Sequence, residues 1–268
     1  MTQALEARSG AKDQWLADAV SVLTADDRVA AVWVFGSEGR GESDGLSDID
    51  ICVAFFDADS TELDRIPSWL RRLGTLMSSK EAPYNAPQDG RYFAARYPAR
   101  PVDITVDSYW QPLSAAAIGS DTKILVDKVD LSPAVPARLQ IELFPSMRDG
   151  LAPSVPSDPL EALQSQVEWF WFMVTIVAKH LARGWDTASE VAMLWAVVDN
   201  TARYVGAPVL ESGIRPDGLR PLLEEMKRIG VEEAVGLPTP VERANAYSWL
   251  ELAETLVAEG WTPGPGGG

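Results

Sequence analysis

The first half of the chain alternates short apolar runs with longer amphipathic stretches. Short runs of Val, Ile, Phe, Tyr and Trp predict strands, whereas apolar residues at helical spacing predict helices at about residues 11–24 and 60–78. The expected strands are residues 30–35, 49–56, 91–97, 102–107 and 124–126. Strands that alternate with helices in this way predict an α+β (or α/β) domain with a mixed sheet.

The second half has a helical pattern throughout, and capping residues mark its helices. The first helix begins with Asp158 as N-cap, Pro159 at the first helical position and Glu161 in the first turn, and it ends at Gly184. Helices joined by short loops predict an all-α helical bundle. The expected helices are residues 158–184, 187–206, 217–230 and 239–260.

Prolines concentrate between Asp130 and Pro159, which is typical of a segment that connects two domains. We therefore expect a first domain over residues 1–150 and a helical domain over residues 151–268.

The composition narrows the class of protein. The chain has 23 Lys and Arg against 39 Asp and Glu, so its net charge is −16, which argues against binding a long nucleic acid through its phosphates. The longest apolar run, residues 169–178, is shorter than the roughly 20 residues that a membrane-spanning helix needs. A single cysteine, Cys52, and an N-terminus without a charged-then-apolar leader favour a cytoplasmic protein without a membrane partner.

The most informative segment is VWVFGSEGRGESDGLSDIDICV, residues 32–53. Asp48 and Asp50 open a predicted strand, and residues i and i+2 of a strand share a face, so both carboxylates point the same way. Such a pair repels unless a cation lies between its members. Hard oxygen ligands of this kind suit Mg²⁺, which also retains substrate phosphates in its shell.

A glycine-rich loop lies between the two strands of this segment. Gly36 allows the backbone to approach a ligand closely, and Ser37 adds a hydroxyl donor, so the pair predicts a phosphate-binding turn. Arg40 in the same loop is a candidate for a further phosphate contact. A phosphate-binding turn next to a metal site is what a nucleoside triphosphate requires.

Three common alternatives fit this segment less well. A P-loop would need a GK[ST] sequence after its glycines, and none follows. A dinucleotide-binding fingerprint would lead into a helix, whereas the next clear element is a strand. A calcium-binding EF-hand loop that begins at Asp44 would need a glutamate where the chain has Phe55.

The combination of a Gly-Ser turn, a spacer of about ten residues and SDxD before an apolar strand resembles the signature of the polymerase-beta-like nucleotidyltransferase superfamily. The resemblance rests on Gly36, Ser37, Ser47, Asp48 and Asp50.

The resemblance implies a third carboxylate from a later strand, next to the metal pair. Asp103 and Asp107 both qualify, because they would share one face of the predicted strand. Asp103 is favoured, since it lies nearer the start of that strand between Val102 and Ile104.

Within the superfamily, the order of a catalytic domain and a helical bundle is similar to that of the aminoglycoside and lincosamide nucleotidyltransferases. Residues 124–128 resemble a strand common in that branch, and Lys179 with Arg183 and Gly184 matches its first bundle helix. The departures are that Lys128 is followed by Val-Asp instead of Asp-Gly, and that no acceptor-site residues align.

Helical geometry gives a separate reason to consider Lys179. At 100° per residue, a polar stripe runs down one side of an otherwise apolar helix and includes Glu168, Thr175 and Lys179. We expect this stripe to face a cleft between the domains, where ligand sites are common. Lys179 would then contact the triphosphate, and Glu168 would line the acceptor pocket.

These observations predict Mg²⁺-dependent transfer of AMP from ATP to a hydroxyl of a small acceptor, with release of pyrophosphate. Asp48 and Asp50 would hold Mg²⁺, and Asp103 would act as general base, metal ligand or both. A cationic acceptor such as an aminoglycoside suits the acidic chain. The alternatives are nucleotidylylation of a protein or RNA end, and a catalytically silent nucleotide-binding relative.

Overall fold

The computed structural model describes residues 3–56, 60–131, 157–210 and 215–263. The chain divides into two compact units, Met1–Ser154 with Pro263–Gly268 and Val155–Thr262. The boundary predicted near residue 151 lies outside the described residues. No described helix is both long enough and apolar enough to cross a membrane.

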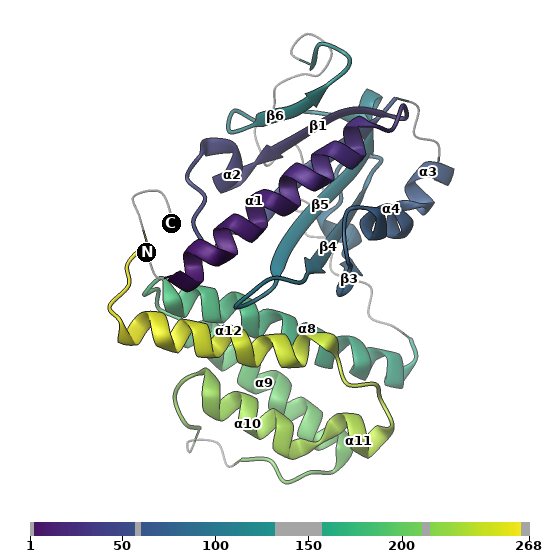
Figure 1. Ribbon diagram of the computed structural model, residues 1–268. Helices are drawn as coiled ribbons and strands as arrows, with labels where there is room; N and C mark the ends of the chain where they lie inside the picture. The colour runs from purple at the N-terminus through teal and green to yellow at the C-terminus, as the bar shows by residue number, and fades with distance from the viewer. Residues whose placement is uncertain (1–2, 57–59, 132–156, 211–214, 264–268) are drawn as a thin grey trace. The chain divides into compact units, whose positions relative to one another are not determined.

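The N-terminal unit is built around a mixed six-stranded sheet in the order β3-β4-β5-β2-β1-β6. β2 and β5 are parallel, and the other neighbouring strands are antiparallel. Figure 1 shows α1 running across this sheet. The elements of this unit are α1 Gln3–Thr24, β1 Val29–Phe35, α2 Gly36–Arg40, β2 Ile49–Phe55, α3 Ser60–Asp64, α4 Ile66–Arg72, β3 Ser78–Glu81, η1 Pro83–Asn85, β4 Arg91–Tyr97, β5 Ile104–Pro112, η2 Leu113–Ala115 and β6 Lys123–Asp127.

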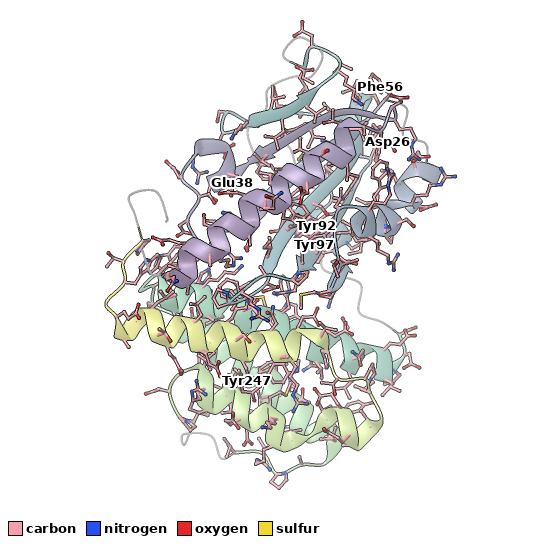
Figure 2. The ribbon with its side chains drawn as sticks, viewed as in Figure 1. Asp26, Glu38, Phe56, Tyr92, Tyr97 and Tyr247 are labelled. Carbon is pink, nitrogen blue, oxygen red and sulfur yellow. The ribbon has the colours of Figure 1, made fainter. Side chains whose placement is uncertain are left out.

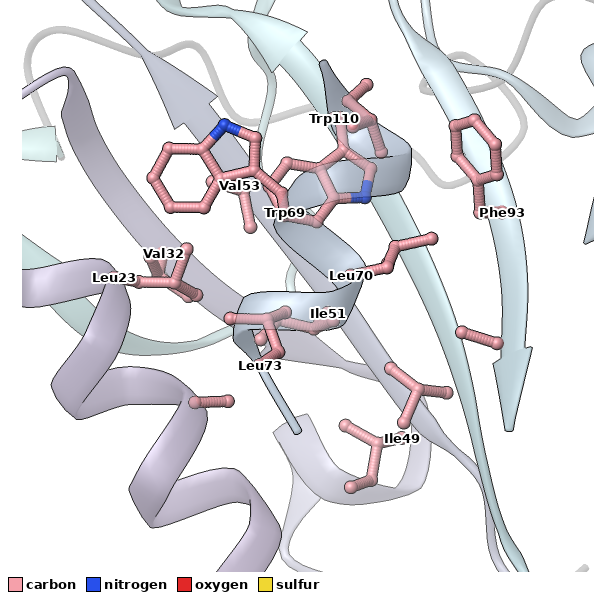
Figure 3. Close-up of a cluster of buried hydrophobic side chains, with 14 of the residues drawn as sticks. Leu23, Val32, Ile49, Ile51, Val53, Trp69, Leu70, Leu73, Phe93 and Trp110 are labelled. Atoms are coloured by element: carbon pink, nitrogen blue, oxygen red, sulfur yellow. The ribbon is translucent and has the colours of Figure 1, made fainter. Parts of the chain in front are cut away.

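The hydrophobic core covers one face of the sheet. Trp15 and Leu23 of α1 and Trp69 of α4 pack there against alternate residues of the strands, among them Ile51 and Trp110 (Figure 3). Because side chains alternate along a strand, the neighbouring residues point to the opposite face. All seven residues of β1 are nevertheless buried, which explains why this strand reads as a continuous apolar run.

The predicted α+β fold class is confirmed, with differences in the elements. Each of the five expected strands is present, and β5 extends beyond its predicted end to Pro112. The expected helix over residues 60–78 is divided into α3 and α4, and its predicted C-terminal end is the edge strand β3. Part of the expected glycine-rich loop is the short helix α2.

The C-terminal unit is helical, as predicted, and α8 packs against both α9 and α12. The predicted cap of α8 is confirmed, because Oδ1 of Asp158 accepts hydrogen bonds from the N–H groups of Leu160 (2.8 Å) and Glu161 (3.0 Å). Trp171 and Trp249 are buried in this unit. Its helices are α8 Pro159–Ala182, α9 Ala188–Val205, α10 Leu219–Ile229, α11 Val231–Val235 and α12 Val241–Ala258.

Candidate active site

Asp48 and Asp50 lie at the start of β2, and the sheet places Asp107 beside them. The register of the parallel strands β2 and β5 pairs Asp50 with Asp107. The residues that precede them, Ile49 and Val106, lie in the hydrophobic core, so both aspartates point to the other face. Two carboxylates from separate strands therefore lie at the same level on one side of the sheet.

The backbone of Gly36 lies directly against the Asp50 carboxylate. β1 ends at Phe35, whose pairing partner in β2 is Asp50, and α2 begins at the next residue. Gly36 has φ of +62°, and a Cβ added there would lie 2.7 Å from Oδ2 of Asp50. Glycine suits this position, because a side chain would displace the carboxylate and strain the backbone.

A hydrogen-bonded turn leads the chain into β2. Oδ1 of Asp44 accepts hydrogen bonds from the N–H of Leu46 (2.9 Å) and the hydroxyl of Ser47 (2.7 Å). The N–H of Asp44 in turn donates to Oγ of Ser47 at 3.0 Å. Because Ser47 directly precedes Asp48, this turn helps to fix the position of Asp48.

Asp103, predicted as the third carboxylate, is engaged in a buried ion pair. Its Oδ2 lies 2.7 Å from Nη1 of Arg96, and the two side chains are 1% and 3% exposed. The sheet register places Asp107, and not Asp103, next to Asp50. The third carboxylate at the level of the predicted metal pair is therefore Asp107, the second of the two candidates.

Two buried tyrosines that the sequence analysis did not identify lie next to Asp107. The hydroxyl of Tyr92 donates a hydrogen bond of 2.7 Å to Oδ1 of Asp107, and the rings of Tyr92 and Tyr109 are 4.9 Å apart. Burial raises the pKa of Tyr109, and the negative charges of Asp107, Asp50 and Asp48 raise it further. The charges of all three carboxylates thus raise the pKa of one phenol, as expected for groups on the same face of the sheet.

Arg40 is held by two carboxylates. Its Nε lies 2.6 Å from Oε2 of Glu42, and its Nη1 lies 3.2 Å from Oδ2 of Asp121. The hydrogen bond to Glu42 raises the pKa of the guanidinium further above its ordinary value. A phosphate at Arg40 would have to compete with both partners, so the contact predicted for this residue stays a prediction.

Comparison with known families finds a similarity for part of this arrangement. Residues 18–79 match the family described as "Polymerase beta, Nucleotidyltransferase". This segment is therefore similar to that family, and the match does not extend to β5 or Asp107. The matched residues include β1, α2 and β2, and therefore Gly36, Asp48 and Asp50.

A crystal structure from H. pylori, described as a "putative nucleotidyltransferase", was also found to be similar. The match has 11% sequence identity and a TM-score of 0.25, and it covers 97% of this chain and 96% of that chain. No curated protein matches the sequence. The assignment of the superfamily therefore depends on residues 18–79.

The N-terminal unit has carboxylates of the kind that bind Mg²⁺. In the described part of the chain, no three His, Cys, Asp or Glu side chains are arranged so that they could hold a metal ion, so the predicted group of Asp48, Asp50 and Asp103 is not formed. Mg²⁺ usually needs only one or two carboxylates, because water and substrate phosphates complete its shell. The neighbouring Asp50 and Asp107 fit this mode of binding.

The remaining predicted site residues lie on α8 of the C-terminal unit. Lys179 is 4% exposed, and its Nζ lies 4.9 Å from the centre of the Trp249 ring. Thr175, in the same polar stripe, is fully buried and donates a hydrogen bond to the carbonyl of Phe172 at 2.7 Å. Glu168 is half-buried and accepts a hydrogen bond from Gln164. The stripe is therefore partly buried within its own unit.

Proposed function

We propose that the chain transfers a nucleoside monophosphate, most simply AMP from ATP, to a hydroxyl of a small cationic acceptor and releases pyrophosphate. The acceptor class we favour is an aminoglycoside-type antibiotic. Nucleotidyl transfer is the activity of the family that residues 18–79 match. The donor nucleotide, the metal and the acceptor are the parts that this proposal adds.

The single observation that carries the proposal is the pairing of Asp50 with Asp107 across two parallel strands, with Gly36 packed against Asp50. Two carboxylates at one level repel each other and are stabilised by a shared cation. The close approach of Gly36 to Asp50, with Ser37 as the next residue of α2, supports this proposal. The carboxylates suit a metal, and the turn suits the phosphates that the metal binds.

In the proposed reaction, Asp50 and Asp107 would hold Mg²⁺, with water and phosphate oxygens as its other ligands, and the ion would neutralise phosphate charge. The acceptor hydroxyl oxygen forms a bond to the α-phosphorus. The bond between that phosphorus and the oxygen bridging to the β-phosphate breaks, and pyrophosphate leaves with the electron pair. The hydroxyl proton passes to the Asp107 carboxylate, whose other partner is the Tyr92 hydroxyl.

Asp107 takes the role that the sequence predicted for Asp103. A carboxylate that accepts the acceptor's proton has to lie near the metal ligands. Asp107 lies beside Asp50, whereas the Asp103 carboxylate is bound to the buried guanidinium of Arg96. Gly36 and Ser37 keep their proposed role at the phosphates.

Lys179 and Glu168 remain sequence-based proposals. Lys179 would contact the triphosphate, and Glu168 would contact the acceptor. Under this hypothesis Lys179→Met raises the KM for ATP, while Glu168→Gln raises the KM for the acceptor. Steady-state kinetics with each substrate varied in turn separates the two roles.

The proposed class of acceptor follows from charge. With a net charge of −16, the chain attracts cations, and a polycationic acceptor would be enriched near its surface. Attraction of this kind depends on ionic strength. The KM for the acceptor should therefore rise with added salt, more steeply than the KM for an uncharged acceptor.

The proposal is tested first by calorimetry with ATP and Mg²⁺, and then by pyrophosphate release across a panel of aminoglycosides and lincosamides. We expect binding of the nucleotide and acceptor-dependent release of pyrophosphate. Asp50→Asn should abolish the release. Asp64→Asn is the matched control, because it also neutralises a carboxylate of the N-terminal unit, but one that is 77% exposed on α3.

Three results would overturn the proposal. An Asp50→Asn variant that is folded and fully active would remove the carboxylate from the mechanism. Binding of ATP without turnover on any acceptor of the panel would indicate a nucleotide-binding protein, and turnover only on a protein or RNA end would indicate a macromolecular acceptor.

A further inference from the structure

Two cationic side chains are buried on the face of α1 that packs against the rest of the N-terminal unit. Arg8 is 0% exposed and Lys12 is 2% exposed. They are four residues apart, so they lie on one side of the helix. Together with Leu5 and Trp15 they form the buried side of α1. Burying a cation is costly unless it is well paired, so their partners are informative.

Arg8 binds main-chain carbonyls at the starts of two strands that carry aspartates of the site. Its Nη1 donates to the carbonyls of Gly45 (2.6 Å) and Ser47 (3.2 Å), directly before Asp48. Its Nε donates to the carbonyl of Asp103 at 3.0 Å, directly before β5. One guanidinium therefore connects the segments that lead into β2 and β5.

Lys12 binds the loop between β1 and β2 at other points. Its Nζ lies 2.6 Å from Oε1 of Glu38 and donates hydrogen bonds to Oγ of Ser43 and, at 3.2 Å, to the carbonyl of Asp44. The hydroxyl of Ser43 donates to the same Glu38 oxygen at 2.6 Å. Glu38 lies next to Ser37 in α2 and beside α1 in Figure 2. Lys12 thus connects α1 to both the phosphate-binding turn and the approach to Asp48.

The loop also packs against the backbone of α1. A Cβ added at Gly45 would lie 2.8 Å from Cβ and from the carbonyl oxygen of Leu5. Leu5 is one turn before Arg8 on the same helix. The contact at Gly45 and the hydrogen bonds of Arg8 therefore hold the same short segment against α1.

We infer that Arg8 and Lys12 are positioning residues of the nucleotidyl-transfer site, and that they fix Asp48 and Asp50 relative to Asp107 by holding the main chain before each strand. This inference rests on the proposed function of those aspartates. Both residues precede the segment that matches the family, residues 18–79. The support for the carboxylates thus comes from a part of the chain outside that match.

The decisive variant is Arg8→Lys. Lysine keeps the positive charge, but one ammonium cannot replace a rigid guanidinium that reaches two chain segments. Because misplacing reacting groups by about 1 Å can cost about 100-fold, we expect kcat for pyrophosphate release to fall by about 10- to 100-fold. The KM for ATP should change much less, since Arg8 donates to main-chain carbonyls of the segments that support the site.

Gly45→Ala provides a second variant that keeps both cations. Its added methyl group meets the backbone of Leu5, so the loop has to move away from α1. We expect the same pattern, a lower kcat with a smaller change in KM. The matched control is Leu70→Ala, which removes buried side-chain volume from α4 (Figure 3). Leu70 lies in the core, on the face of the sheet opposite to Asp50 and Asp107. This substitution should lower Tm without lowering kcat per folded molecule.

Hydrogen exchange separates this inference from the proposed function. Amides in residues 43–50 and 102–108 should exchange faster in Arg8→Lys than in the unmodified chain, in both segments at once. If the unmodified chain releases no pyrophosphate with any acceptor, the proposed function fails, and exchange alone decides whether Arg8 holds the two segments. Unchanged exchange in either segment, or an Arg8→Lys variant with the original kcat, overturns the inference. Loss of kcat in Leu70→Ala equal to that in Arg8→Lys also overturns it, because stability would then explain both.

Discussion

The close contact between Gly36 and Asp50 allows a test of whether a small shift of the Asp50 carboxylate lowers activity. In Gly36→Ala the new Cβ would lie 2.7 Å from Oδ2 of Asp50, a separation that stable contacts do not reach, so the carboxylate has to shift. The backbone at φ +62° adds a second penalty, because a left-handed conformation costs a non-glycine residue about 1–2 kcal/mol. The substitution therefore combines backbone strain with displacement of a proposed metal ligand.

Gly41→Ala is a control that carries the strain alone. Gly41 ends α2 with φ of +71°, and a Cβ added there meets no atom within 4 Å. Both variants should lose about 1–2 kcal/mol of unfolding free energy from the backbone. For a chain of this size, that loss corresponds to a decrease in Tm of about 2–8 °C.

The two variants share the backbone penalty and should differ above all in activity. We expect Gly36→Ala to lower kcat for pyrophosphate release by about 10- to 100-fold and to raise the Mg²⁺ concentration that gives half-maximal activity. Gly41→Ala should keep both values. Steady-state kinetics over a Mg²⁺ titration, with thermal unfolding in parallel, measures these quantities. Equal activity of the two variants would refute the reasoning, since the contact with Asp50 would then have no functional consequence.

Three further substitutions test the assignments of individual carboxylates. Asp107→Asn should lower kcat by at least about 100-fold with little change in Tm, and a fully active variant would exclude it as the third carboxylate. Asp103→Asn should instead lower the unfolding free energy in urea by about 3–5 kcal/mol, because it leaves the Arg96 guanidinium buried without its carboxylate partner, while kcat per folded molecule is retained. The hydrogen bond from Arg28 holds the pKa of Asp26 below its ordinary value of 3.8, so the ionised carboxylate stabilises the fold above that pH and this contribution is lost as the pH falls. The difference in Tm between the unmodified chain and Asp26→Asn should therefore be present at pH 7 and shrink below about pH 4, as thermal unfolding at several pH values would measure, and a constant difference would contradict the assignment.

Elements that show an apolar run or a capping residue within their own segment could be predicted from the sequence. The apolar runs of β1 and β2 follow from burial, and the cap of α8 follows from local hydrogen bonds of Asp158. The edge strand β3 has the sequence Ser-Ser-Lys-Glu, with no apolar residue. Its extended conformation comes from pairing with β4, and a pattern within one segment cannot indicate that.

The start of α1 was missed for a related reason. The apolar stripe of this helix, traced back from Leu23 through Trp15, is interrupted by Lys12 and Arg8, so the sequence predicted a helix only from about residue 11. Both residues are buried, but their partners lie between 26 (Lys12 to Glu38) and 95 (Arg8 to Asp103) residues away along the chain. Charged residues are normally exposed. Their burial becomes predictable only once the loop carbonyls that bind them are placed.

The choice between Asp103 and Asp107 shows where sequence reasoning on the site ends. Asp107 lies in β5 and Asp103 directly before it, so periodicity within the segment does not choose between them. Which one lies beside Asp50 depends on the register between β2 and β5, and these strands are separated by the whole of α3, α4, β3 and β4. A shift of one residue in that register would turn the aspartates to the opposite face, and a shift of four would exchange their roles. This register comes with contacts between distant segments, namely the hydrogen bonds of Arg8 at the entry to both strands and the ion pair of Arg96 with Asp103. Because one guanidinium holds the main chain before both strands, a change at Arg8 should affect Asp107 as much as Asp48.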